Sequence, residues 1–130
     1  MKKYVNFCKA LENLRIVKEV EEPYDILTMT GSVALFEICF EQSWKAMKAI
    51  LTEHGYAEGL TGSPKMIIKL AYSAGMINDE EKWLEMLDSR NDITHSYNEE
   101  IAFQIINHTK KDYICLFEKL KAAIDEKWMI

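Results

Sequence analysis

The sequence has few helix-breaking residues and no long apolar run. It contains two prolines and five glycines in 130 residues, and strand-like alternation is nearly absent, so we predict an all-helical protein with short loops. No segment approaches the roughly 18 consecutive apolar residues of a membrane span. Asn6, Lys9 and Glu12 interrupt the N-terminal stretch where a signal peptide would be continuously apolar. We therefore expect a cytoplasmic protein that does not enter a membrane.

Cysteine is also scarce, and its placement argues against a disulfide or metal site. Cys8, Cys39 and Cys115 are far apart, odd in number and in no Cys-x-x-Cys arrangement, so we predict reduced cysteines in the core. The histidines lack the His-x-x-x-His spacing, or a neighbouring cysteine pair, that places metal ligands on one helical face. We expect no metal and no cofactor.

Positive charge is in the minority. The chain has 16 Lys plus Arg against 21 Asp plus Glu, a net charge of −5, which argues against indiscriminate duplex binding because that binding relies on clustered basic side chains. A role with nucleic acid would need a local basic site. The 48% hydrophobic content is enough for one core, and the length predicts a single domain over residues 1–130.

Apolar residues recur at spacings of three and four, which predicts four main helices and a short one in an antiparallel up-and-down bundle. The expected helices cover residues 3–21, 25–54 and 63–75, then a helix starting at 78 or 79, then one from near 96 through 124. Ser63 is the expected N-cap of the short helix, and Ser96 and Glu99 have capping-box spacing. The first helix is expected to bury Val5, Cys8, Leu11, Leu14 and Val17.

The long second helix has a second apolar face in addition to its main stripe. This face consists of Leu27, Gly31, Leu35, Ile38, Ala46 and Ala49, which are too apolar and too small for a solvated surface. Either the helix is central in the bundle, or the second face packs against another chain across a two-fold axis. We favour a homodimer.

Two charged residues occupy positions where the helical pattern calls for apolar ones. Glu37 falls within the stripe of the long helix, and Arg90 continues a stripe of the later helix. Because an unpaired buried charge costs several kcal/mol, we predict that these two residues face each other, with Glu41 as the alternative acid. A purely structural ion pair remains the alternative interpretation.

The segment after Arg90 gathers polar side chains suited to RNA chemistry. Asn91, Asp92 and Thr94 are weak helix formers, so we expect the helix to fray here and the polar groups to converge at the start of the next helix, whose free N–H groups suit a phosphate. An arginine on a phosphodiester and a histidine that titrates near neutral pH are a minimal set for metal-free RNA cleavage. A two-fold dimer would supply two histidines.

The segment that begins at Arg90 resembles the signature of the HEPN superfamily. Residues 90–97 read Arg-Asn-Asp-Ile-Thr-His-Ser-Tyr, which is an arginine, four residues, a histidine, one residue and a tyrosine. Several flanking segments resemble the subgroup called nucleotidyltransferase substrate-binding proteins. These segments are Phe36-Glu37, Phe40 to Lys45, Ser63-Pro64, Ala74-Gly75, Trp83-Leu84 and Tyr97 to Glu100.

This resemblance implies a small, usually dimeric helical bundle that works with a separately encoded minimal nucleotidyltransferase. It implies that Arg90 and His95 are catalytic, that Asn91 is a supporting residue, and that Tyr97 accepts AMP from the partner. Glu37 is assigned a supporting role from the helical stripe alone.

Three hypotheses about function follow. The chain is a metal-independent endoribonuclease toxin controlled by AMP addition to Tyr97, which we place first. Alternatively, it is a non-catalytic subunit that binds a nucleotide or acceptor substrate for a two-chain nucleotidyltransferase. The third hypothesis is a structural helical dimer without chemistry.

Overall fold

Helices account for most of the structure, a computed structural model that describes residues 1–56 and 61–129. The helices are α1 (Lys2–Leu14), α2 (Ile26–Glu53), α3 (Pro64–Ser73), α4 (Glu80–His95), α5 (Glu99–His108) and α6 (Ile114–Ala123). A π-helical turn at Thr109–Tyr113 joins α5 to α6, and a second one follows at Ile124–Trp128. Residues 99–128 therefore form one long helix, and the predicted all-helical bundle is confirmed.

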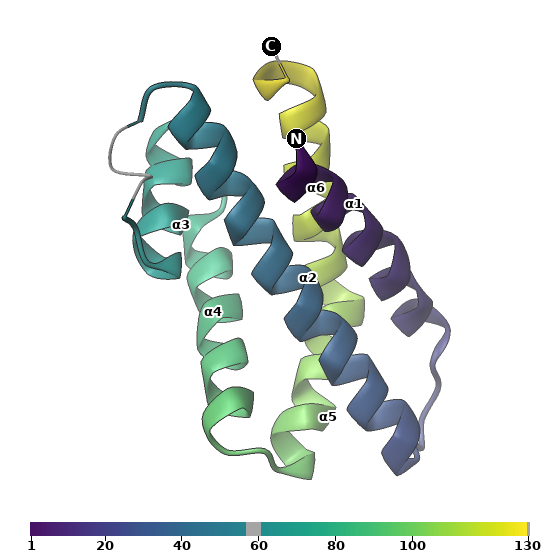
Figure 1. Cartoon of the computed structure of the whole chain (residues 1–130). Coiled ribbons are helices and arrows are strands. Elements are labelled where there is room, and N and C mark those ends of the chain that lie inside the picture. The colour runs from purple at the N-terminus through teal and green to yellow at the C-terminus, as the bar shows by residue number, and fades with distance from the viewer. Residues whose placement is uncertain (57–60, 130) are drawn as a thin grey trace.

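The helices alternate in direction, and α2 is central (Figure 1). It packs against α1, α3, α4 and α5, and it crosses the front of the bundle in Figure 1 with no helix lying over it. The turn between α4 and α5 lies at the opposite end of the molecule from both chain ends. None of the helices in the described ranges is both long and apolar enough to span a membrane.

The helix starts agree with the sequence except at the last helix. Ser63 and Asp79 cap α3 and α4 through hydrogen bonds from the N–H groups three residues on. The residue that caps α5 is Asn98, whose side chain accepts from the Ile101 N–H at 2.9 Å. The capping-box expectation for Ser96 is wrong, because Ser96 instead ends α4.

The first helical segment ends two residues early and buries most of the expected stripe: Leu11, Leu14 and Val17 are buried. Its α-helix ends at Leu14 and continues as a 3-10 segment over Arg15–Glu19. Val5 is 47% exposed, whereas Tyr4 and Phe7 are buried. The rings of Phe7 and Phe117 meet edge to face with centroids 6.2 Å apart. Burying these larger aromatic side chains removes more apolar surface from water than burying Val5 would, so they set the inward face of α1.

The core is aromatic where α2, α4 and the C-terminal helix meet. Phe36 of α2 stacks on Tyr113 with ring centroids 5.4 Å apart. The Tyr113 hydroxyl reaches the Ser89 hydroxyl of α4 at 2.9 Å. Burial raises the pKa of Tyr113, because the low-dielectric core disfavours the phenolate. This partly buried contact fixes one face of α4 against the C-terminal helix.

The second apolar face of α2 is only partly covered in one copy of the chain. Leu27 is 83% exposed and Ile38 is 52% exposed, while Ala46 is fully buried; Leu35 and Ala49 are half-buried. The central position of α2 therefore accounts for the covered residues of the C-terminal half, whereas the N-terminal half is open in one copy of the chain.

The cysteines are free, but they do not all lie in the core. Cys39 is buried, Cys8 is half-buried and Cys115 is exposed. Burial raises the pKa of the Cys39 thiol, since desolvation disfavours a thiolate. The expectation of a core position is therefore wrong for Cys115.

Candidate functional site

The polar segment that begins at Arg90 continues α4 for more than one turn. The helix extends to His95. The expectation that it frays from Asn91 is therefore wrong. Ile93 is only 4% exposed, and this buried side chain gives the last turn an apolar anchor that outweighs the weak helix propensities around it. Tyr97 lies in the short turn between α4 and α5.

An open groove with a volume of about 490 Å³ lies between α2 and α4, and we call it the motif groove. Its lining residues are Glu37, Ile38 and Glu41 from α2 and Arg90, Asn91, Thr94 and His95 from α4. The fold thus brings together four of the five predicted site residues; the fifth, Tyr97, lies two positions beyond His95.

The partner of Arg90 is Glu41, so the predicted pairing with Glu37 is wrong. Arg90 Nη2 donates to Glu41 Oε2 at 2.6 Å. Thr94 Oγ1 donates to Glu37 Oε2 at 3.3 Å. Because α2 and α4 run in opposite directions, moving four residues forward along α4 corresponds to moving four residues back along α2. Arg90 is therefore level with Glu41, and Thr94 is level with Glu37.

The arginine is held from two further sides. Its Nη1 donates to Asn91 Oδ1 at 3.0 Å, and its Cζ lies 5.8 Å from the centre of the Phe40 ring. The Arg90 and Glu41 side chains are 24% and 31% exposed, so the pair is half-buried and not the buried pair that the stripe predicted. A guanidinium has five N–H donors, and the exposed ones remain available to an anion in the groove.

His95 lines the groove at the last residue of α4, and Tyr97 follows in the turn. His95 is exposed, and Tyr97 is 48% exposed, so both side chains are accessible to a macromolecular substrate or partner.

The start of α5 is a poorer anion site than the sequence suggested. The Asn98 side chain already occupies one backbone N–H, and Glu99 and Glu100 place acidic side chains in the first turn. These carboxylates oppose a phosphate at that helix end. Anion binding is better served by Arg90.

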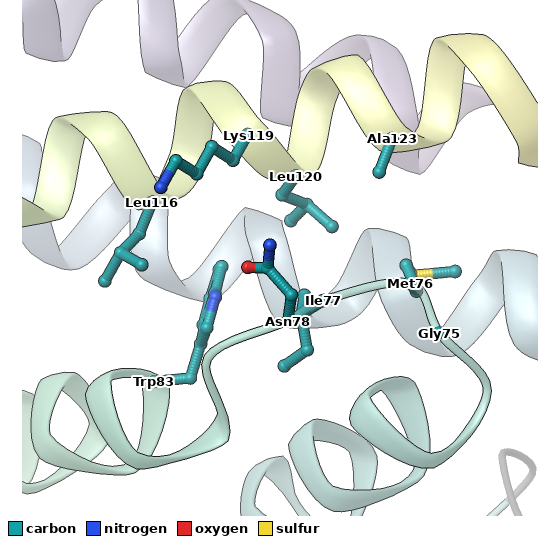
Figure 2. A pocket seen from close by; sticks show the side chains of 9 residues that line it. All are labelled: Gly75, Met76, Ile77, Asn78, Trp83, Leu116, Lys119, Leu120 and Ala123. Carbon is teal, nitrogen blue, oxygen red and sulfur yellow. The ribbon is translucent and has the colours of Figure 1, made fainter.

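A second cavity, with a volume of about 110 Å³, lies where the α3–α4 connection meets α6. Figure 2 shows Trp83 and Asn78 on one side, facing Leu116, Lys119 and Leu120 of the C-terminal helix. It contains none of the predicted site residues, so the motif groove is the better candidate site.

Comparison with known proteins bears on this groove. The family described as "Nucleotidyltransferase substrate binding protein like" matches residues 2–126. The chain belongs to this nucleotidyltransferase substrate-binding family. The match confirms the resemblance drawn from the motif and its flanks.

The chain is also similar to one curated protein and to one solved structure. It is 32% identical over 79 residues to "Probable ribonuclease HepT" of Haemophilus influenzae. The matched stretch covers 59% of this chain and about half, 54%, of that protein. A crystal structure of a protein from Thermus thermophilus has a TM-score of 0.76 and 35% identity, and the match covers 89% of this chain and 96% of that one. This second similarity supports the helical fold.

Sequence reasoning placed Glu41 second to Glu37 as the partner of Arg90, and it gave Thr94 no contact with the long helix. The register of α4 on α2 is the signal that identifies both contacts. In an antiparallel pair, each step forward along one helix is matched by a step back along the other, so the pairing of Arg90 with Glu41 also pairs Thr94 with Glu37. Helical periodicity alone places Glu37 and Glu41 on the same face, and it does not say which of them is level with Arg90.

Proposed function

We propose that this member of the nucleotidyltransferase substrate-binding family is a metal-independent endoribonuclease toxin. The observation that carries the proposal is the common placement of Arg90 and His95 in one open groove, with the arginine held by Glu41 and Asn91. The similarity to a relative named as a probable ribonuclease supports the same class of activity.

The two side chains match the needs of RNA cleavage. A base removes the proton from a ribose 2′-hydroxyl, and the 2′-oxygen then attacks phosphorus. The bond from phosphorus to the 5′-oxygen breaks, and an acid protonates that oxygen, leaving a cyclic phosphate and a 5′-hydroxyl. Arg90 binds the phosphate and stabilises its developing negative charge. His95 serves as the base or the acid.

The proposed active form is a homodimer, because one chain contributes one histidine to the groove. Ile38 lines the groove and is 52% exposed, and Leu27 is 83% exposed on the same helix. A second copy packed on this apolar surface would bring its own His95 towards the first, so that one histidine acts as base and the other as acid.

We place control of the nuclease with a separately encoded minimal nucleotidyltransferase. In the proposed modification, the Tyr97 hydroxyl oxygen attacks the α-phosphorus of ATP, its proton is lost, and pyrophosphate leaves with AMP bound to the tyrosine. The exposure of Tyr97 supports access by such an enzyme. An added nucleotide two residues from His95 would put a negative charge and a bulky base where RNA must enter.

The first test is cleavage of a mixed RNA pool in excess EDTA by protein made without the partner. His95→Ala should lower the cleavage rate by at least about a hundredfold, the scale of a lost general acid or base. His54→Ala is the matched control, since His54 is an exposed histidine at the C-terminal end of α2 and does not line the motif groove. It should retain wild-type cleavage.

Cleavage that persists in His95→Ala would contradict the catalytic assignment. If neither wild-type protein nor either variant cleaves RNA, and mass spectrometry finds no AMP on the folded protein, the nuclease proposal fails. The substrate-binding subunit then becomes the better account.

The second test concerns Tyr97. Mass spectrometry after co-expression with the adjacent nucleotidyltransferase should find AMP on the peptide that contains Tyr97, and Tyr97→Phe should abolish that mass shift. Tyr72→Phe is the matched control, because Tyr72 has the same exposed fraction, 48%, on α3. Only unmodified peptide from the wild-type chain would contradict the role of Tyr97.

A further inference from the structure

A second groove begins next to the motif groove and has the opposite charge from the chain as a whole. It has a volume of about 510 Å³ and lies along α1 and α2. Three lysines, Lys3, Lys45 and Lys48, and one acid, Glu53, line it, with Trp44 and Ala49 as apolar lining. We call it the lysine groove. In a chain with a net charge of −5, this is the local basic site that the sequence alone did not locate.

The lysines of this groove have few internal partners. Lys45 Nζ lies 3.9 Å from Glu41 Oε1. Within the described residues, no acidic group lies within 4.0 Å of the ammonium of Lys3 or Lys48, in contrast to Lys82 and Lys121, which have acidic partners. Two of the three charges are therefore available to an external anion.

One residue of the motif groove, Glu41, links the two grooves through its ion pairs. Glu41 contacts Arg90 of the motif groove at 2.6 Å and Lys45 of the lysine groove at 3.9 Å. From Glu41 to Lys48 the helix axis rises about 10 Å. A stacked strand, at about 3.4 Å per phosphate, places about three phosphates along that length. A strand cut at Arg90 could therefore extend directly over the lysines.

We propose that the lysine groove binds the phosphates of the single-stranded RNA that is cleaved in the motif groove. The inference rests on the proposed nuclease function and adds the path of the substrate to it. Lys3 and Lys48 neutralise phosphates about three positions along the strand from the one held by Arg90, and the exposed part of Trp44 provides an apolar surface beneath the strand.

The test measures RNA affinity against salt by fluorescence anisotropy, with a fluorescein-labelled 12-nucleotide single-stranded RNA of mixed sequence. All proteins carry His95→Ala so that the probe stays intact. The groove variant is Lys3→Gln with Lys48→Gln, which leaves the contacts of Glu41 untouched. The matched control is Lys65→Gln with Lys69→Gln, two exposed lysines of α3.

Each lost phosphate contact lowers the salt slope of single-strand binding by about 0.7. The groove variant should therefore lose about 1.4 from the slope of log affinity against log salt, and its defect should grow about sevenfold between 200 and 50 mM salt. The control pair should keep the wild-type slope. An unchanged slope in the groove variant, or an equal loss in both pairs, would overturn the inference.

Failure of this inference is distinguishable from failure of the nuclease proposal. If wild-type protein cleaves RNA in EDTA but the groove variant keeps its slope, the path of the strand is wrong and the nuclease stands. If no protein cleaves RNA but the groove variant alone loses slope, the RNA-binding groove stands and the nuclease does not. Absence of RNA binding by every protein at 50 mM salt contradicts the inference.

Discussion

The exposed face of α2 has two halves of different chemistry. The N-terminal half presents Leu27, Gly31, Ala34 and Ile38, and we call it the apolar half. The C-terminal half presents Lys45 and Lys48, and we call it the basic half. Glu41 lies between them and binds Arg90.

The difference indicates that one helix serves two kinds of partner. Exposed apolar side chains on a helix favour another protein surface, whereas lysine side chains that line an open groove favour an anion. The ion pair of Glu41 and Arg90 lies where these surfaces meet. A site at such a boundary can be completed by a second chain on one side and by a charged strand on the other.

The largest effect is expected from placing charge on the apolar half. Leu27→Asp with Ile38→Asp should raise the dimer dissociation constant by about a hundredfold or more, because two desolvated carboxylates would face the partner. Leu27 is in the first turn of α2, where an acid suits the helix dipole, so the monomer should remain folded. Light scattering with size-exclusion chromatography measures the change.

The matched control for that experiment is Met66→Asp with Tyr72→Asp. These are two exposed apolar residues of α3, 56% and 48% accessible, outside the apolar half. The control should keep the wild-type mass. A wild-type chain that is monomeric at high concentration, or a control that dissociates equally, would show that the apolar half has no special role.

An intermediate effect is expected at the boundary between the halves. A double-mutant cycle of Arg90→Ala and Glu41→Ala should give a coupling of about 1 kcal/mol in urea unfolding, since the pair is only half-buried. The cycle of Arg90→Ala with Glu37→Ala should give a coupling near zero, because Glu37 contacts Thr94. A larger coupling to Glu37 than to Glu41 would contradict the observed register.

The smallest effect is expected at the start of the apolar half. Asp25 caps α2 by accepting from the Thr28 N–H at 2.7 Å, and this hydrogen bond lowers the pKa of the Asp25 carboxyl. A lowered pKa contributes stability at pH above the unfolded value of about 4, and the contribution is lost as pH falls through the folded pKa. NMR titration of the Asp25 side chain measures that pKa.

Asp25→Asn is the control for this effect, because it keeps a capping oxygen and removes the ionisation. Its acid unfolding curve should be flatter than the wild-type curve between about pH 4 and the lowered pKa. If the two proteins have identical acid unfolding curves, the ionisation of Asp25 does not contribute to the pH dependence of stability.

The sequence predicts the helices well because their signals are local. Ser63 and Asp79 cap as expected, and Gly55 and Gly75 follow α2 and α3 with φ of 91° and 83°, a backbone region that favours glycine. Arg90, Asn91 and His95, which are close together in α4, do lie in one groove. These features depend on spacing along a single helix.

The features that the sequence does not predict depend on how two helices meet. Whether Arg90 pairs with Glu37 or Glu41 is set by the register of α4 on α2, and no local pattern encodes that register. The inward face of α1 follows from the contact of Phe7 with Phe117 of a distant helix. Ile93 keeps α4 helical to His95 by burial that only the folded bundle supplies.

Ser89 and Arg90 are neighbours on α4, yet they contact different helices. Ser89 reaches Tyr113 of the C-terminal helix, and Arg90 reaches Glu41 of α2. Consecutive helical residues point about 100° apart, so the two contacts together fix the rotation of α4 about its axis. Inserting or deleting one residue within α4 before Ser89 would turn both side chains away from their partners. The chain should therefore tolerate a substitution in this part of α4 better than a change in its length.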